Sequence, residues 1–307
     1  MPARKSIVAK VPKLSRRELV RYRRQIVLPE VGTTGQRTLK ASSALVVGIG
    51  GLGNPAASYL AAAGVGRIGL VDGDVVEDSN LHRQPLFSES DLGRNKAVAA
   101  KAHLLRINPN VDVSAFSKSL DSSNAMNVIS GFDIVIDSTD NLPSRYLISD
   151  ACVLSGKPDV YASALRFDGQ ASIFYAPKGP CYRCLYPQPP PPNKIESCED
   201  AGVLGVLPGI MGGVQALQAV SILLGVGSPL IGRLLVFSGL YSSFEELRIK
   251  KNPRCLACGP KPEIRRLIDY DEFCSRGKTA PGEPIAPRRC GWHQVRRRPL
   301  DPLVTLT

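Results

Sequence analysis

A glycine-rich turn between an apolar strand and a helix constrains this chain more than any other feature. Residues 45–53 read Leu-Val-Val-Gly-Ile-Gly-Gly-Leu-Gly, and a second apolar run, 67–72, ends in Asp72. The spacing is close to the ~20 residues expected between the glycines and the acid of a dinucleotide-binding βαβ unit. Such glycines let backbone N–H groups approach a phosphate at a helix N-terminus. The pattern predicts a nucleotide site on Gly48, Gly50, Gly51 and Gly53, with Asp72 bonding a ribose hydroxyl.

Strands and helices alternate along the first part of the chain. Apolar runs predict strands at 44–48, 67–72, 111–116, 133–137, 159–162 and 170–175. Helical spacing predicts helices at 15–40 (interrupted by Pro29 and Gly32), 53–63, 95–107, 122–130 and 141–155. This alternation indicates an α/β fold with a doubly wound, mostly parallel, Rossmann-like sheet. Two further strands, 234–238 and 245–250, predict an antiparallel pair at the C-terminal side.

The formal net charge of +12 is concentrated at the two ends of the chain. Residues 1–24 and 261–307 are rich in Lys and Arg, whereas the body between them is close to neutral. Basic ends are usually solvated tails rather than a binding groove. We therefore expect a disordered basic extension at 1–14, a Pro/Arg-rich tail at 261–307, and no direct contact with nucleic acid.

A long uncharged stretch, 201–232, could be mistaken for a membrane span. It contains Pro208, the pair Gly212-Gly213 and two glutamines, which favours a helix buried under the sheet at about 212–224. No membrane association is expected.

Eight cysteines without a signal peptide favour a reducing, cytoplasmic setting over disulfide formation, and import into an organelle is the weaker interpretation of the basic start.

Basic residues downstream of Asp72 distinguish between nucleotides. The glycine turn alone also fits NAD enzymes, but a dehydrogenase has no need of Arg83 and Lys96 beyond the ribose acid. A triphosphate needs both, because they can hold phosphate oxygens and neutralise the charge of departing pyrophosphate. His82, next to Arg83, is a candidate to line the site. Taken singly, an arginine such as Arg83 is more often a surface ion-pairing residue.

Asp140 follows the apolar strand 133–137, at the sheet edge where open α/β folds bind ligands. Mg²⁺ prefers oxygen ligands beside substrate phosphates, so Asp140 is a candidate magnesium ligand. An N-cap of the next helix, supplied by Asp140 or Asn141, is an equally good interpretation of the same residues.

Two Cys-x-x-Cys pairs suggest a metal site. Cys181 with Cys184, and Cys255 with Cys258, provide the four thiolates of a closed, structural tetrahedral Zn²⁺ site. The long separation leaves a redox role for each pair as the alternative. Among the other cysteines, Cys152 is expected in the core. Cys198, in polar surroundings after a proline-rich loop, is a candidate nucleophile that the sequence does not show to be activated.

Taken together, these motifs resemble the MoeB/ThiF group of ubiquitin-activating-type adenylyltransferases. The resemblance rests on 21–29 (Arg-Tyr-Arg-Arg-Gln-Ile-Val-Leu-Pro), the glycine turn, 79–84 (Ser-Asn-Leu-His-Arg-Gln), Asp140-Asn141, both cysteine pairs and 198–209. It implies binding of Mg·ATP and of a small ubiquitin-like sulfur carrier ending in Gly-Gly, such as the molybdopterin synthase small subunit or the ubiquitin-related modifier of tRNA thiolation. The carrier's terminal carboxylate would attack the α-phosphate, giving an acyl-adenylate and pyrophosphate.

The resemblance also implies roles for single residues. Arg24 would reach the ATP of a neighbouring subunit, so that a homodimer is the working unit. Cys198 would attack the adenylate and form a thioester, and the two cysteine pairs would bind zinc. The residues implied to bind ATP are Gly51, Asp72, Ser79, Asn80, Leu81, His82, Arg83, Lys96, Asp140 and Asn141.

One departure from the family lies at the C-terminal end. The eukaryotic members continue into a rhodanese-like domain bearing a persulfide cysteine, and residues 261–307 are too few to form one. The adenylyltransferase domain is therefore expected at 15–260, with sulfur supplied by a separate protein or with the chain a truncated product. The weaker alternatives are a NAD-dependent oxidoreductase, a catalytically silent scaffold, and adenylation of a tRNA base.

Overall fold

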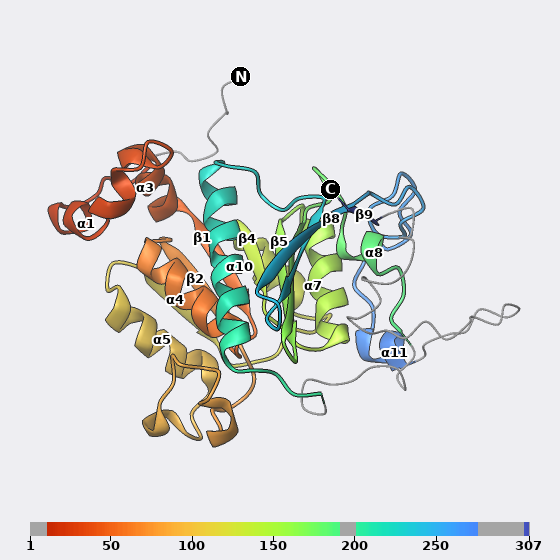
Figure 1. Ribbon diagram of the computed structural model, residues 1–307, viewed down its shortest axis with the longest axis horizontal. Coiled ribbons are helices and arrows are strands. Elements are labelled where there is room, and N and C mark those ends of the chain that lie inside the picture. Colours follow the sequence, from red (N-terminus) through yellow and green to blue (C-terminus); the bar gives the residue numbers. More distant parts are fainter. Residues whose placement is uncertain (1–10, 191–200, 276–303, 307) are drawn as a thin grey trace, which may run out of the picture.

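The strands of this protein form one mixed sheet (Figure 1). The computed structural model describes residues 11–190, 201–275 and 304–306. The strand order is β3-β2-β1-β4-β5-β6-β7-β8-β9, parallel from β3 to β5 and antiparallel from β5 onwards. The strands are β1 (Ser43–Val47), β2 (Arg67–Val71), β3 (Asp112–Phe116), β4 (Ile134–Asp137), β5 (Asp159–Leu165), β6 (Asp168–Phe174), β7 (Arg233–Ser238), β8 (Ser243–Ile249) and β9 (Val304–Leu306). The doubly wound sheet and its antiparallel C-terminal pair are confirmed, whereas β9 was not predicted.

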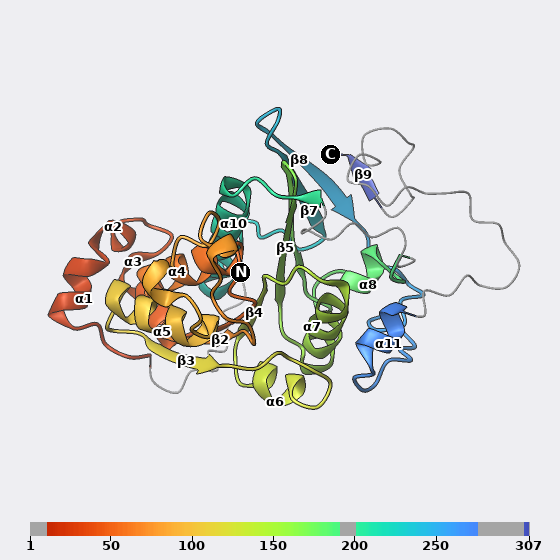
Figure 2. The ribbon, with the colours of Figure 1, turned by 90° about the horizontal axis from the view of Figure 1, so that it is seen from below.

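The helices lie on both faces of the sheet, with α4 and α10 on one side and α6 and α7 on the other (Figure 2). They are α1 (Arg16–Arg21), α2 (Arg23–Ile26), α3 (Gly32–Ala41), α4 (Gly53–Ala63), α5 (Lys96–Ile107), α6 (Ala125–Ser130), α7 (Leu142–Ser155), α8 (Tyr182–Leu185), α10 (Val206–Leu224) and α11 (Tyr270–Ser275).

Every residue of β1 is buried, because alternate side chains enter the core on each face. This two-sided burial explains the continuous apolar run in the sequence.

The position of the nucleotide site follows from the strand order. β1 pairs with β2 on one side and with β4 on the other, so the chain reverses its direction of winding at β1. All three strands are parallel, and the loops that follow them leave the sheet at the same edge. Open α/β sheets bind ligands in the crevice at such a reversal.

Helix α10 is the apolar stretch that resembles a membrane span. It is the one helix of the described chain that is long and apolar enough, by length and composition, to cross a bilayer. It packs on α4, and an added Cβ at Gly212 would lie 2.3 Å from the Leu52 carbonyl oxygen. Its buried Gln215 amide donates to the carbonyls of Asp137 and Val160, at 2.6 and 2.9 Å. α10 is therefore a core helix, and it begins six residues before the predicted start.

Candidate nucleotide site and metal centre

The glycine turn after β1 has no room for side chains. Gly48 has φ +83°, and an added Cβ would lie 2.9 Å from the Ser138 carbonyl oxygen. At Gly53 an added Cβ would lie 1.9 Å from the Gly48 carbonyl oxygen. At Gly51 it would lie 2.9 Å from a Pro208 side-chain carbon, whereas Gly50 is less crowded. The turn therefore keeps the bare backbone that close approach of a phosphate requires.

Asp72 holds this turn in place. Its carboxylate accepts hydrogen bonds from the backbone N–H of Ile49 at 2.7 Å and of Asp74 at 2.8 Å. Burial raises the pKa of Asp72, while these two hydrogen bonds and the nearby Lys96 oppose the shift. The sequence suggested only the ribose contact; the link from Asp72 back to Ile49 is a tertiary feature.

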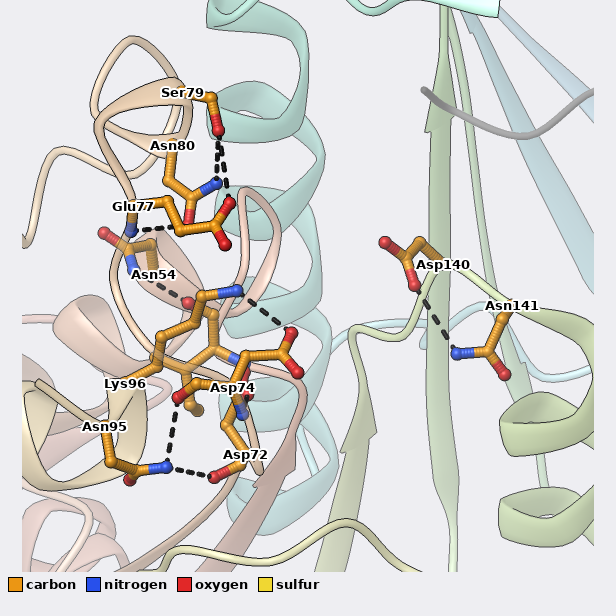
Figure 3. A network of polar contacts seen from close by, with 11 residues as sticks. Asn54, Asp72, Asp74, Glu77, Ser79, Asn80, Asn95, Lys96, Asp140 and Asn141 are labelled. Atoms are coloured by element: carbon orange, nitrogen blue, oxygen red, sulfur yellow. Dashed lines mark hydrogen bonds and ion pairs between the residues drawn. The ribbon is translucent and has the colours of Figure 1, made fainter. Parts of the chain in front are cut away.

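Lys96 lies at the start of α5 and points at the loop after β2 (Figure 3). Its ammonium contacts the Asp74 carboxylate at 3.1 Å. The Lys96 side chain is only 10% exposed, whereas that of Asp74 is 73% exposed. The buried lysine is thus held by a solvent-exposed partner that an incoming phosphate can displace. Sequence reasoning missed Asp74, although its position two residues after Asp72 on the same loop was a usable signal.

Asn95 completes this cluster and was also missed. Its Nδ2 donates to the carbonyls of Asp72 and Asp74, at 2.9 and 3.0 Å, and its Oδ1 accepts the Val98 N–H at 3.2 Å. One side chain therefore caps α5 and fixes the loop that carries both acids. The Asn at the start of the Lys96 helix was a recognisable N-cap signal.

Residues 79–83 form a short 3₁₀ turn and the loop after it. Asn80 is buried, where its Oδ1 accepts the Glu77 N–H at 3.3 Å and its Nδ2 donates to Ser79 Oγ at 3.3 Å. Leu81 packs against the core beneath α4 and α10. The half-buried Arg83 donates to the Ser79 carbonyl at 2.7 Å and contacts Nε2 of the exposed His82 at 2.8 Å. Asn80 and Leu81 thus shape the loop that presents His82 and Arg83.

Arg24 and Arg83 line the same groove, of about 1060 Å³. The groove runs between α2, α4 and α10, and its walls include the exposed apolar side chains Tyr59, Val206 and Leu217. The structure therefore brings Arg24 and Arg83 of one chain to one surface, which no spacing in the sequence indicated.

The sequence left open whether Asp140 is a candidate magnesium ligand or whether Asp140 or Asn141 caps the next helix. Asn141 Oδ1 accepts the Ser144 N–H at 2.9 Å and caps α7. Among the residues that the structure describes, the exposed Asp140 carboxylate has one hydrogen bond, a long one of 3.5 Å from Asn141 Nδ2 (Figure 3). The cap is thus Asn141, and Asp140 keeps its oxygens available for a cation such as Mg²⁺.

The two cysteine pairs meet in one buried cluster. The sulfurs of Cys181, Cys184, Cys255 and Cys258 lie within 4.8 Å of one another. The Cys181–Cys255 and Cys184–Cys258 sulfur distances are 3.5 and 3.4 Å, and Cys181–Cys184 is 3.9 Å. Four thiolates around one zinc ion would be about 3.8 Å apart, from a Zn–S bond of ~2.3 Å. The cluster could therefore hold a tetrahedral metal ion, and each pair approaches the other rather than standing alone.

Cys198 lies outside the residues that the structure describes. The chain after it is described from Ala201, and Val203 forms a bridge with Arg166 beyond the end of β5. An added Cβ at Gly205 would lie 2.5 Å from the His82 carbonyl oxygen. The segment that follows the candidate nucleophile is thus packed against the loop of His82 and Arg83. Cys152, by contrast, is a core residue of α7, as predicted.

Comparison with known proteins agrees with this arrangement. A "Sulfur carrier protein adenylyltransferase" of Thermus thermophilus is 49% identical over 265 residues, covering 85% of this chain and 98% of the relative. "Adenylyltransferase and sulfurtransferase MOCS3" of Mus musculus is 50% identical over 267 residues, covering 87% of this chain but only 58% of the relative. This chain thus spans nearly all of the bacterial relative and somewhat under two thirds of the MOCS3 relative.

Solved structures show the same fold. The crystal structure of E. coli MccB with ATP matches with a TM-score of 0.67 at 24% identity, covering 78% of this chain and 73% of that one. The structure of PaaA matches with a TM-score of 0.66 at 26% identity, covering 82% and 79%. The ThiF family model matches residues 22–257, which include the glycine turn, Lys96, Asp140 and three of the four clustered cysteines, and which end one residue before Cys258. The chain belongs to the ThiF family.

Proposed function

We propose that this protein is an ATP-dependent adenylyltransferase whose acceptor is the C-terminal glycine carboxylate of a ubiquitin-like sulfur carrier. The observation that carries the proposal is the buried Lys96, which faces the exposed end of Asp74 beside the glycine turn. A buried lysine with a displaceable partner fits a ligand with several phosphates better than it fits a dinucleotide. The two relatives named for adenylyl transfer support the same conclusion.

The reaction needs positioning and charge neutralisation more than proton transfer. A carrier carboxylate is already ionised near pH 7, so its oxygen can attack the α-phosphorus without a general base. The new carboxyl O–P bond forms as the bond to the β-phosphate breaks, and pyrophosphate leaves. Lys96 and Arg83 would hold the phosphates and offset the charge on the leaving group. Asp72 would bond the ribose through lone pairs that its two backbone contacts leave available.

Asp140 is the residue proposed to hold Mg²⁺. Its exposed carboxylate, with one long contact, fits the oxygen donor that this ion requires. The ion would supply charge neutralisation beside the phosphates. A second groove, of about 710 Å³, lies between residues 119–123 and the start of α7. Ser119, which lines this groove, lies close to Gly73, since an added Cβ at Gly73 would be 2.7 Å from Ser119 Oγ, and this groove would hold the nucleotide base.

Cys198 is proposed to take over the activated carrier. Its thiolate would attack the acyl carbon of the adenylate, so that a C–S bond forms, the C–O bond to phosphate breaks and AMP leaves. Sulfur would then come from a separate sulfurtransferase. The products would serve molybdenum cofactor synthesis, tRNA wobble-uridine thiolation or both, in the cytoplasm. The domain boundaries at 1–14, 15–260 and 261–307 remain predictions.

A homodimer is the proposed working form. The groove that contains Arg24 and Arg83 is apolar along α10 and α4, with Leu217 61% and Tyr59 61% exposed. A second copy could cover these side chains and bring its Arg24 to the nucleotide site of the first copy.

The decisive experiment is ATP–pyrophosphate exchange with purified carriers, followed by a search for a thiol-sensitive adduct. We expect exchange that depends on an intact Gly-Gly terminus, and a covalent carrier adduct that is absent in Cys198→Ala. Cys152→Ala is the matched control, because Cys152 is a core residue away from the predicted site, and it should keep both signals. The proposal fails if no Gly-Gly carrier supports exchange, or if NAD binds in place of ATP.

A further inference from the structure

Buried polar atoms without a hydrogen-bond partner gather between helix α7 and strands β4 and β5. The part of the chain that the structure describes contains five such side-chain atoms, and four of them belong to Asp137, Ser149 and Asp159. Each of these three residues is only 1% exposed. Buried polar groups are normally satisfied, so a group of unsatisfied ones requires an explanation. The proposed adenylyl transfer uses none of these atoms.

The strand register places the two carboxyls on one face of the sheet. On neighbouring parallel strands, Asp159 lies opposite Val135, and Asp137 is two residues further along β4. Side chains two residues apart point to the same face of a strand. Val135 packs in the core cluster that includes Cys152 of α7, so both acids face this helix as well.

Helix α7 turns a polar stripe towards these acids. Arg145, Ser149 and Cys152 follow one another at spacings of four and three residues, which places them on one face of the helix. The guanidinium carbon of Arg145 lies 5.4 Å from the ring centroid of Tyr161 on β5. Since an arginine side chain stays protonated in proteins, the stripe supplies one permanent cation beside two carboxyls.

Asp137 organises the loop that carries Asp140. Its Oδ1 accepts hydrogen bonds from the Thr139 N–H at 3.0 Å and from the Thr139 hydroxyl at 2.6 Å. Arg145 Nη2 donates to the Thr139 carbonyl at 3.1 Å. The same loop packs against the glycine turn through the Ser138 carbonyl. A change in the charge around Asp137 and Arg145 therefore reaches both the candidate magnesium ligand and the glycine turn.

One cation cannot balance two ionised carboxylates in a buried site. Burial raises the pKa of Asp159 well above its ordinary range, Asp137 raises it further, and Arg145 opposes both. The neighbour of Asp159 on β6 is the uncharged Phe174. Burial also raises the pKa of the nearby thiol and phenol, which are therefore neutral, and one lysine follows α7; these groups are Cys152, Tyr161 and Lys157.

We propose that Asp159 is a positioning residue for adenylyl transfer, an inference that rests on the proposed function. While Asp159 keeps its proton, Asp137 is the one carboxylate beside Arg145 and holds Thr139 in place. When Asp159 loses its proton to solvent, the second negative charge competes for Arg145, which then releases the Thr139 carbonyl and lets the Asp140 loop shift. The enzyme is therefore active with Asp159 neutral and loses activity as Asp159 ionises.

The first test is the pH profile of kcat in ATP–pyrophosphate exchange for wild type, Asp159→Asn and Asp159→Leu. Neither substituted side chain can ionise, and the second variant keeps the test usable if the first does not fold. We expect wild-type kcat to fall at alkaline pH by about tenfold per pH unit, and the fall in both variants to begin about one pH unit higher. The matched control is Asp112→Asn, at the exposed start of β3, which should keep the wild-type profile. Identical profiles of wild type and the Asp159 variants overturn the inference.

Amide hydrogen exchange provides a second readout that needs no substrate. Relative to the intrinsic exchange rate, protection of the amides at 138–141 should fall in wild type as pH rises and should persist in Asp159→Asn. Protection with the same pH dependence in both proteins overturns the inference. If protection of this loop depends on Asp159 but no Gly-Gly carrier supports pyrophosphate exchange, only the proposed function fails.

Discussion

At the scale of single residues, two buried charged side chains are fixed by contacts with the loops that follow β1 and β2. Lys96 is one of them, because its ammonium contacts the exposed carboxylate of Asp74 at 3.1 Å. Asp72 is equally constrained, since both of its oxygens are bonded to backbone N–H groups. Both residues belong to the proposed nucleotide site.

Removing the Lys96 charge should slow adenylation while leaving the fold intact. Lys96→Met should lower kcat/KM in ATP–pyrophosphate exchange by about 10²–10³, the usual effect of losing one group that stabilises developing charge. Lys96→Arg should recover part of the loss. Lys101→Met, an exposed lysine of the same helix, is the control and should leave exchange unchanged. Equal activity of Lys96→Met and Lys101→Met would contradict the assignment.

Asp159 is a buried carboxyl that the proposed chemistry does not use. Neither of its oxygens has a hydrogen-bond partner among the described residues. Burial raises the pKa of Asp159 well above its ordinary range, and the neighbouring Asp137 raises it further. As pH rises, the folded chain therefore keeps a proton on Asp159 that the unfolded chain has already released. This contribution to stability is fully present below the ordinary Asp pKa and is lost as pH rises through the folded pKa.

Asp159→Asn should consequently stabilise the protein at alkaline pH. We expect a gain in the free energy of unfolding of about 2 kcal/mol at pH 8 and a much smaller gain at pH 5, because Asn carries no charge to desolvate. Urea unfolding at the two pH values measures the difference. Asp112→Asn, at the exposed start of β3, is the matched control and should show no pH-dependent gain. A gain that is equal at both pH values would argue against a buried ionisation.

At the scale of secondary-structure elements, one buried cation joins three of them. Arg183 of α8 forms a two-pronged ion pair with Asp150 of α7, with both N–O distances 2.8 Å. Its guanidinium lies 4.7 Å from the ring centroids of both Tyr146 and Phe273. Tyr270 of α11 donates to the same Asp150 at 2.7 Å. Because Arg183 stands between two clustered cysteines, the metal site is connected to α7 and α11 through this pair.

Removing only one partner of the Arg183–Asp150 ion pair should lower the free energy of unfolding strongly. Arg183→Met leaves the Asp150 charge buried and should lower the free energy of unfolding by about 4 kcal/mol, whereas Tyr270→Phe should lower it by only about 1 kcal/mol. Adding Asp150→Asn to Arg183→Met should recover part of the loss. Urea unfolding provides the values, and Arg254→Met, at an exposed position beside Cys255, serves as the control. Additive losses in the double variant would mean that the two residues do not act as a pair.

The cysteine cluster should bind about one metal ion per chain and stabilise the C-terminal strands. Cys255→Ser, or a strong chelator, should remove the metal and lower the melting temperature by roughly 10 °C. Elemental analysis and thermal unfolding test this together. Cys152→Ala should retain the full metal content, because Cys152 is a core residue outside the cluster. Metal-free wild-type protein with unchanged melting after chelation would favour the redox interpretation.

At the scale of the whole molecule, the groove that contains Arg24 predicts a shared active site. If Arg24 acts in the partner subunit, Arg24→Ala and Lys96→Met chains should each be inactive alone and should complement when mixed. A random mixture would recover about a quarter of wild-type exchange, since only one site in each mixed dimer is intact. Unfolding and refolding the two chains together, followed by exchange assay, provides the measurement. No recovery from a mixture shown to contain mixed dimers would place both residues in one chain's site.

Features that depend on short stretches of chain could be predicted from the sequence. The βαβ unit, its glycines and Asp72 lie within thirty residues, so spacing and hydrophobic pattern determine them. The same is true of each cysteine pair and of the helix that contains Lys96, whereas the burial of Lys96 was not predicted. The start of α10 was placed too late because Pro208 and the paired glycines look like helix breakers, although Pro is tolerated in the first turn and Gly212 is required for contact with Leu52.

Only the tertiary structure decided which distant residues act together. The placing of Arg24 and Arg83 in one groove and the Arg183–Asp150 pair both depend on strand order and helix packing. The sequence analysis did not predict β9, because a three-residue strand forms only where it pairs with another strand, here β8. The physical reason is common to these cases. A sequence pattern encodes local backbone preference and burial, whereas contacts between remote segments arise when the sheet brings their ends to one edge.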